Sequence, residues 1–164
     1  MSVKRAFAEG TSVAVERSKA EIESVLNRYG ATGFASARDG LRNRIEFVAN
    51  ARRVRFDLTL PGPEDDRFKY ARRSTWRLAP ASARQERWEA EQRRLWRALL
   101  LAIKAKLEVV ESGMAIFEEE FMANIVMPDG RTVGQHAMPA IAKAYQSGRV
   151  VALLPAAVDV ETEP

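Results

Sequence analysis

The sequence predicts an α+β fold in which an antiparallel three-stranded meander packs on a long central helix. Three short segments of alternating apolar and polar residues follow one another, and a much longer segment with apolar residues at helical spacing comes after them. A helix precedes the strands, and short helices follow the long one. At 164 residues the chain is long enough to bury a core of its own. We assign residues 1–157 to a single domain and residues 158–164 to a flexible polar tail.

The first helix is predicted between residues 18 and 29. Ser18 can act as its N-cap, and Glu21 lies three residues later, where its side chain can bond back to the cap. Four large residues then recur at helical spacing, namely Ile22, Val25, Leu26 and Tyr29. Gly30 follows them, and glycine is common where a helix ends.

Strands are predicted at residues 33–38, 44–49 and 53–60. In the second and third strands, apolar residues alternate with polar ones, so each strand has an apolar face and a polar face. Asn50-Ala51 marks the turn between them, because asparagine tolerates the left-handed backbone that a tight hairpin needs. We expect the apolar face to lie on a helix. The polar face, which carries Arg53 and Arg55, would then face water or a ligand.

Residues 67–80 are predicted to form an exposed basic and aromatic arm. They follow a stretch rich in proline and glycine at 61–63 and show no regular period. Within residues 67–77, five cations are interleaved with three aromatic residues. Cations neutralise phosphates and aromatic rings accept stacked bases, so this composition is typical of a surface that binds nucleic acid. In the alternative interpretation, the rings pack into the core and only the cationic groups reach water.

The long helix is predicted from an N-cap at Ser82 to about residue 111. It carries Trp88 and Trp96 among aliphatic residues, and tryptophans in that setting are usually core or interface anchors. A shorter helix around residues 117–125 and a turn at 128–130 follow. A last helix is predicted at 139–147, with Pro139 in its first turn and Gly148 after its end.

Charge is unevenly distributed along the chain. Residues 1–40 contain 6 basic and 5 acidic side chains, a net charge of +1. Residues 41–97 contain 15 basic and 8 acidic side chains, a net charge of +7. Residues 98–164 contain 5 basic and 9 acidic side chains, a net charge of −4. A concentrated positive region attracts polyanions. The residues predicted to bind nucleic acid are Arg53, Arg55, Arg67, Lys69, Tyr70, Arg72, Arg73, Trp76, Arg77, Arg87 and Arg94.

The sequence offers no catalytic or metal-binding signature. It contains no cysteine, which excludes disulfides and thiolate metal sites. His136 is the sole histidine, and no nucleophile or metal motif accompanies it. Glu118, Glu119 and Glu120 would point in different directions on a helix, which indicates a solvated acidic face. We therefore expect a protein that is not an enzyme and that takes no cofactor, metal or small-molecule substrate.

The longest apolar run is far shorter than a membrane span. It covers residues 98–103 and is followed by Lys104 and Lys106. The first residues also lack the apolar stretch of a secretory signal. Together with the lack of cysteine, these features predict a cytoplasmic protein with no membrane partner.

Three segments resemble a family of small uncharacterised proteins carried by phages and prophages. They are RYGATGF at 28–34, VRFDLTLP at 54–61 and WRALLLAIKAKLEVVESGMAIFEEEFMANIVMPDGRTVG at 96–134. This likeness implies a genomic context but no activity. The order of a meander and a long helix is also similar to the core of phage single-strand annealing proteins, which form oligomers along DNA. It resembles a double-stranded-RNA-binding domain as well, but the lysine-rich helix start of those domains is missing here.

From these features we expect a protein that binds or anneals single-stranded DNA in phage-type recombination or replication, as a homo-oligomer. The sequence leaves open whether the polymer is DNA or RNA, and single-stranded or double-stranded. A protein-interaction or assembly module is the alternative. In that case the basic middle of one subunit would meet the acidic C-terminal third of another, or the chain would inhibit a host factor.

Overall fold

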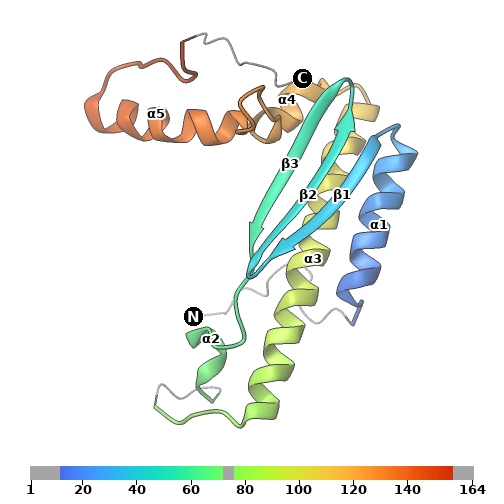
Figure 1. The fold of residues 1–164 in the computed structure, drawn as a ribbon, viewed down its shortest axis with the longest axis vertical. Coiled ribbons are helices and arrows are strands. Elements are labelled where there is room, and N and C mark those ends of the chain that lie inside the picture. Colours follow the sequence, from blue (N-terminus) through green and yellow to red (C-terminus); the bar gives the residue numbers. More distant parts are fainter. Residues whose placement is uncertain (1–11, 72–75, 157–164) are drawn as a thin grey trace.

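The computed structural model describes residues 12–71 and 76–156 and has an α+β fold, as predicted (Figure 1). A helix leads into a three-stranded antiparallel sheet, a long helix follows, and short helices end the chain. In chain order the elements are α1 (Val15–Arg28), β1 (Thr32–Asp39), β2 (Arg42–Ala49), β3 (Arg52–Thr59), α2 (Asp66–Lys69), α3 (Ala81–Glu111), α4 (Phe117–Phe121), the 3₁₀ helix η1 (Met122–Asn124) and α5 (Val133–Ser147). The predicted tail at 158–164 lies outside the described residues.

One face of the sheet packs on α3, with α1 alongside, and the core lies between them (Figure 1). The alternation of apolar and polar residues in β2 and β3 dictates which face is buried. The fully buried apolar residues of this core are Ile22, Leu26, Ile45, Phe47, Val54, Ile103 and Phe121. Trp96 belongs to the same core, as predicted, while Trp88 is half-buried and donates from Nε1 to the carbonyl of Pro61 at 2.9 Å.

The turn between β2 and β3 lies where the sequence predicts it. Asn50 and Ala51 both have positive φ, at 48° and 57°, which is the backbone of a two-residue hairpin turn with the twist of the flanking strands. The turn sets the register, in which Ala49 lies opposite Arg52 and Phe47 lies opposite Val54. All the alternating residues of the two strands are thereby assigned to a face.

Two predicted helix starts are wrong by a few residues. α1 begins at Val15, whose side chain packs against the core, so Ser18 lies inside the helix and is fully buried. α3 begins at Ala81 behind Pro80, so Ser82 lies in the first turn and caps nothing. Proline suits a helix start because its fixed φ fits and its missing N–H is not needed there. The capping patterns at Ser18 and Ser82 therefore did not determine where the two helices begin.

The last helix also starts earlier than predicted, at Val133. Thr132 and Gln135 form a capping box, so Pro139 lies in the middle of α5. A proline there cannot donate to the carbonyl four residues before it, which belongs to Gln135. Arg131 supplies the missing donor, because its Nη2 lies 2.9 Å from that carbonyl oxygen. The helix ends at Gly148, which has a left-handed backbone, as predicted.

Between α4 and α5 the chain passes around the edge of β3. Phe117 and Phe121 of α4 are buried on the core side of the sheet. Ile125 then pairs with Val54, and the amide of Val126 donates to the carbonyl of Arg53 at 2.8 Å. After a turn at 127–130, α5 begins on the other side of the sheet and extends away from it (Figure 1). Within residues 12–71 and 76–156, no helix has the length and apolar character needed to cross a membrane.

Candidate nucleic-acid interface

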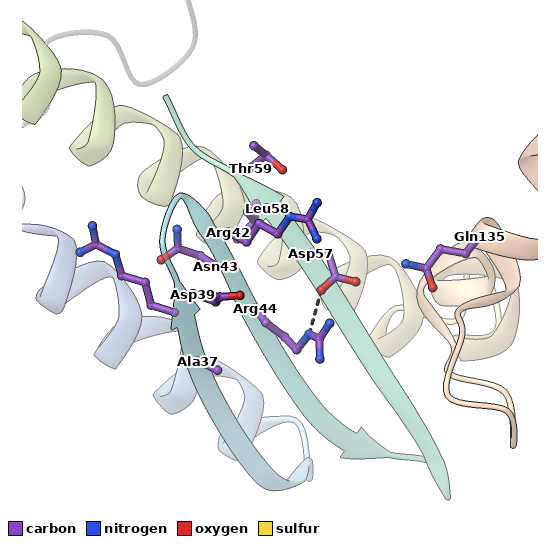
Figure 2. Close-up of a pocket in the computed structure, with 10 residues that line it drawn as sticks. Ala37, Asp39, Arg42, Asn43, Arg44, Asp57, Leu58, Thr59 and Gln135 are labelled. Atoms are coloured by element: carbon purple, nitrogen blue, oxygen red, sulfur yellow. Dashed lines mark hydrogen bonds and ion pairs between the residues drawn. The ribbon is translucent and has the colours of Figure 1, made fainter. Parts of the chain in front are cut away.

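The face of the sheet that does not pack on α3 is open at the end where β1 turns into β2. β1 contributes the short side chain of Ala37 there, while β2 contributes Arg42 and Arg44. The difference in side-chain length leaves a hollow of about 440 Å³, with Gln135 of α5 at its far side (Figure 2). Its lining consists of Ala37, Arg38, Asp39, Arg42, Asn43, Arg44, Asp57, Leu58, Thr59 and Gln135.

Three arginines and two aspartates line this hollow, so it is polar and slightly basic. Arg44 donates from Nε to Oδ1 of Asp57 at 2.8 Å, a bond drawn in Figure 2, and this hydrogen bond raises the pKa of the Arg44 guanidinium. Arg42 is exposed and forms no ion pair with any residue that the structure describes. Arg38 is also exposed and bonds the carbonyl of Gly40 instead of a carboxylate. An anion entering the hollow would therefore meet two arginines that form no ion pair with the described residues and a third that is shared with Asp57.

The two arginines predicted on the polar face of β3 differ in exposure. Arg53 is exposed and lies 3.3 Å from Glu46, measured from Nε to Oε1. Arg55 does not face solvent, and the prediction that it does is wrong. Its Nη1 donates to the carbonyl of Gly130 at 2.8 Å and its Nη2 donates to Oε1 of Gln135 at 2.9 Å, so the hairpin before α5 covers it.

The arm at 67–80 is more ordered than an irregular exposed loop. It begins with the short helix α2, whose start Asp65 caps, and it closes through a bridge between Tyr70 and Leu78. The amide of Ala71 donates to the carbonyl of Arg77 at 2.7 Å, and the amide of Ala79 donates to that of Lys69 at 2.9 Å. The ends of the arm are thus held together at the base of a loop at 70–78.

Arg87 of α3 bonds to the base of the loop, a role different from the phosphate binding predicted for it. Its Nη2 donates to the carbonyl of Phe68 at 2.7 Å and its Nη1 donates to the carbonyl of Tyr70 at 2.9 Å. Its Nε also donates to the carbonyl of Ala83 at 3.1 Å. With these donors satisfied by backbone oxygens, Arg87 is a structural residue, and its prediction as a phosphate-binding residue is not supported by its contacts.

The three aromatic residues of the arm differ in exposure. Phe68 is 5% exposed and belongs to the packing of α2, as the alternative interpretation expected for the rings. Tyr70 is half-buried, with Lys69 Nζ 5.6 Å from the ring centroid. Trp76, in contrast, is 82% exposed. Of the three rings, only that of Trp76 is mostly exposed.

Three further predicted cations lie next to carboxylates. Arg94 donates twice to Glu91, from Nε and Nη2 and at 2.7 Å each, and these bonds hold the pKa of the Glu91 carboxyl below its usual value. Arg67 lies 2.9 Å from Asp65 and 3.7 Å from the same Glu91. Lys69 lies 3.6 Å from Asp66. This part of the surface is therefore nearly neutral, although the sequence alone suggested a dense positive patch.

Three predicted arginines of the arm remain. Arg77 is exposed and adjoins Trp76. Arg72 and Arg73 lie outside the described residues. Arg38 and Arg42, which line the hollow, are not among the residues predicted to bind nucleic acid. Arg42 continues the alternation of the second strand by one step, and a predicted start at 42 instead of 44 would have placed it on the same face as Arg44.

The candidate catalytic groups do not converge. No cluster of three or more histidine, cysteine, aspartate or glutamate side chains occurs in the described parts of the chain. Glu118 lies 3.9 Å from Arg52, whereas Glu120 lies 3.3 Å from Lys106, so the acidic run faces separate partners. His136 Nε2 lies 2.8 Å from Asp129 Oδ2, a contact between the turn and the first turns of α5.

No protein-family model, no curated protein and no solved structure matches this chain. The likeness to phage-borne proteins stays a prediction, and the case for a function depends on the residues themselves.

Proposed function

We propose that this protein binds single-stranded nucleic acid, with single-stranded DNA preferred, and that it does so without catalysis. The observation that carries the proposal is Trp76, which is 82% exposed on a loop whose two ends are fixed to each other. Residues 71–77 contain three arginines, one tryptophan and no acidic residue. This composition joins phosphate-neutralising groups to a stacking surface within one loop.

The exposure of the Trp76 ring supports the proposal on energetic grounds. Leaving a large aromatic side chain in water forgoes about 2 kcal/mol of burial free energy. Stacking a base on such a ring returns about 1–3 kcal/mol per base. The base of the loop is fixed by the bridge between Tyr70 and Leu78 and by the bonds from Arg87. The loop therefore loses less conformational entropy when a ligand binds.

The hollow on the sheet offers a second contact for the same strand. The turn between β1 and β2 adjoins the start of the arm, because the amide of Leu60 donates to the carbonyl of Leu41 at 2.9 Å. Arg42 and Arg44 thus lie at the end of the sheet that leads into the arm (Figures 1 and 2). Exposed ion pairs such as Arg44 with Asp57 contribute only about 0–1 kcal/mol, so a phosphate can replace the carboxylate at low cost.

The biological role that fits this proposal is binding or annealing of single strands in phage-type recombination or replication. The support for that role is the sequence resemblance, and the support for the binding itself is the loop. Annealing would require the protein to bind both a single strand and the newly paired product, which a binding assay alone does not report. Complementary fluorescent oligonucleotides, mixed with and without protein, measure the annealing rate directly.

Fluorescence anisotropy tests the binding. Labelled single-stranded DNA, single-stranded RNA and duplex DNA of equal length are titrated with the protein at about 50 mM and 200 mM salt. We expect the tightest binding for single-stranded DNA, with an affinity that falls as salt rises. Equal and weak binding of all three polymers at the lower salt concentration would reject the proposal.

A further inference from the structure

A second concave site lies beside the sheet, among the start of α1, the strand ends at the turn from β1 to β2, and the middle of α3. In the fold, α1 packs on both α3 and β1 (Figure 1). The pocket has a volume of about 380 Å³, and small-ligand pockets usually measure about 300–1,000 Å³. Its lining joins aromatic, amide and cationic side chains, a mixture that suits a ligand with a flat ring and an anionic group.

The apolar part of the pocket consists of two tryptophans of α3. Trp96 is 2% exposed and Trp88 is half-buried. Nε1 of Trp88 donates to the carbonyl of Pro61 at 2.9 Å, and Nε2 of Gln92, which also lines the pocket, donates to the same oxygen at 3.0 Å. These bonds hold the Trp88 indole in place in the free protein. Fixed aromatic side chains favour a flat aromatic ring as the apolar part of the ligand.

Two cations of the pocket have no carboxylate partner. Lys19 Nζ lies 4.7 Å from the ring centroid of Trp96 and forms no ion pair with the residues that the structure describes. Arg38 donates from Nε to the carbonyl of Gly40 at 3.1 Å, and its two Nη groups have no partner among those residues. Arg38 also lines the hollow on the open face of the sheet. Phosphate oxygens are typical partners of a guanidinium fork and of a lysine, so the anionic group favoured here is a phosphate.

The carboxylates of the pocket are compensated by other groups. Glu89 accepts from Nε2 of Gln85 at 2.8 Å and lies 4.0 Å from Nη1 of Arg93. Glu16 lies in the first turn of α1, where the helix dipole stabilises a negative charge. With three cations and two carboxylates, the lining has a net charge of +1. An anionic ligand can therefore bind without displacing a carboxylate.

Asn43 gives the pocket a specific hydrogen-bonding group. It is 6% exposed, and its one hydrogen bond with a described residue runs from Nδ2 to the carbonyl of Leu41 at 3.3 Å. An amide has one acceptor oxygen and two N–H donors, so Oδ1 and one N–H are left for a ligand. Buried polar atoms in proteins nearly always have a partner, so a free Oδ1 in a pocket favours a ligand that donates to it.

Adenine presents the edge that complements this amide. Its N6 amino group donates and its N7 accepts, and an asparagine side chain binds the two atoms together. Guanine presents two acceptors at the corresponding positions, O6 and N7, so Oδ1 of Asn43 would face another acceptor. The direction of one hydrogen bond therefore distinguishes the two purines.

We propose that this pocket binds an adenine nucleotide. The base lies against the two tryptophans with its N6 and N7 edge on Asn43, and the phosphate lies on Lys19 and Arg38. The nucleotide is either free or one unit of a bound strand, and its chemistry is the same in both cases. The inference does not depend on the loop at 70–78. The sequence predicted no small-molecule ligand, and it could not reveal this pocket because the lining comes from three separate segments.

Tryptophan fluorescence tests the binding without interference from the loop. The chain has three tryptophans, so after Trp76→Phe the two that remain both line the pocket. This variant is titrated with dAMP, dGMP, dCMP, dTMP and deoxyribose 5-phosphate. We expect dAMP to quench the fluorescence and to bind about tenfold more tightly than the other four, on the scale of one bidentate contact. An affinity for dAMP no higher than that for dGMP or for the sugar phosphate would overturn the proposal.

A pair of substitutions tests the phosphate contact. Lys19→Gln with Arg38→Gln should weaken dAMP binding by about tenfold or more, because both uncompensated cations are lost. Arg17→Gln with Arg53→Gln, which changes exposed cations of α1 and β3 outside the pocket lining, is the charge-matched control and should leave the affinity unchanged. Equal losses for the two pairs would also overturn the proposal.

Asn43→Leu is close in size and removes both hydrogen-bonding groups. It should bring the affinity for dAMP down to that for dGMP, and a preference for dAMP that survives the change would rule out recognition of the base by Asn43. Because Asn43 is buried, circular dichroism checks the fold of this variant. The pair at positions 19 and 38 keeps the test independent of it.

Competition distinguishes the two sources of the nucleotide. Oligonucleotides of deoxyadenosine or of thymidine are added to the Trp76→Phe variant with fluorescent dAMP bound. Displacement by the deoxyadenosine oligonucleotide alone would mean that the pocket takes a nucleotide within a strand, and displacement by neither would mean that it takes the free nucleotide. Equal displacement by both would contradict adenine recognition and overturn the proposal.

Discussion

Arg55 of β3 and Gln135 of α5 are eighty residues apart in the sequence, and a 2.9 Å hydrogen bond from Nη2 to Oε1 joins them. The same guanidinium donates to the carbonyl of Gly130, and Gln135 also accepts from the amide of Thr132. Through these bonds one arginine ties the hairpin and the capping box of α5 to the open face of the sheet. α5 also packs against η1, where Gly134 lies close to Ala123.

Replacing Arg55 with alanine should therefore destabilise the fold. The change leaves the carbonyl of Gly130 and the side chain of Gln135 without a charged donor, and we expect the free energy of unfolding to fall by about 2–3 kcal/mol. Urea unfolding followed by circular dichroism measures this. Arg53→Ala on the same strand is the control, because its exposed ion pair should contribute less than about 1 kcal/mol. Equal losses for the two variants would contradict the structural role of Arg55.

Arg87→Ala should loosen the base of the loop at 70–78. Losing two charge-assisted bonds to the carbonyls of Phe68 and Tyr70 should cost this region about 2 kcal/mol of local stability. The exchange of the Ala71 and Ala79 amide hydrogens, which are bonded across the base of the loop, should then accelerate by about 30-fold. Hydrogen exchange read by NMR measures it. Exchange in β2 should not change, and a uniform acceleration would instead indicate global destabilisation.

Trp76→Ala should weaken binding of single-stranded DNA more than binding of duplex. Loss of one stacked base corresponds to about 1–3 kcal/mol, a drop in affinity of roughly 5-fold to 150-fold. Anisotropy titrations measure it, and quenching of tryptophan fluorescence by the oligonucleotide should disappear in the variant. Trp76→Phe should retain most of the affinity. An equal loss on single-stranded and duplex DNA would argue against stacking.

Arg72→Ala combined with Arg73→Ala should reduce the salt dependence of binding. If each arginine neutralises one phosphate of a single strand, the slope of log affinity against log salt should shrink by about 1.4. Titrations at several salt concentrations provide the slope. Arg17→Ala with Arg28→Ala, on α1, serves as a charge-matched control. An unchanged slope in the loop variant would remove these two residues from the interface.

Glu91→Gln should change how stability responds to acid. The bonds from Arg94 lower the pKa of Glu91 in the folded state below its ordinary value of 4.5, so the folded protein holds this proton less tightly than the unfolded chain. The stabilisation is then complete above that ordinary value and is lost as the pH falls through the folded pKa. We expect Glu91→Gln to be less stable by about 1 kcal/mol at neutral pH. The difference from the unaltered protein should vanish in acid.

Urea unfolding midpoints between neutral and acidic pH provide the measurement for Glu91. Glu86→Gln, an exposed change on the same helix, is the control and should alter stability less at neutral pH. A difference between Glu91→Gln and the unaltered protein that persists at the lowest pH would mean that the glutamate acts through packing instead of charge.

The parts of the fold that depend on neighbouring residues were predictable. The turn at Asn50 and Ala51 follows from the backbone that asparagine tolerates, and the buried faces of β2 and β3 follow from alternation. The end of α5 at Gly148 follows from the left-handed conformation of glycine. In each case a few consecutive residues contain the whole physical cause.

The predictions are wrong where a segment distant in the sequence determines the local structure. Arg55 alternates like a surface arginine, and its burial depends on a hairpin about 75 residues later. Ser18 resembles a cap, but Val15 finds core contacts that extend the helix past it. The positive patch on the arm was overestimated for another reason, because most of the carboxylates beside its cations are near in sequence, as Asp66 is to Lys69 and Glu91 is to Arg94. Local patterns contain no information on the contacts of Arg55 and Val15.

The pairing of Ile125 and Val126 with β3 also affects how the sheet could grow. It covers the edge of β3 only around Arg53 and Val54, so the longer exposed edge among the described residues is that of β1. There the regular pairing with β2 is interrupted between Thr32 and Ala35, and Gly33 has a left-handed backbone, so the edge is bent. A bent edge is a poor template for continuous pairing with a strand of another molecule.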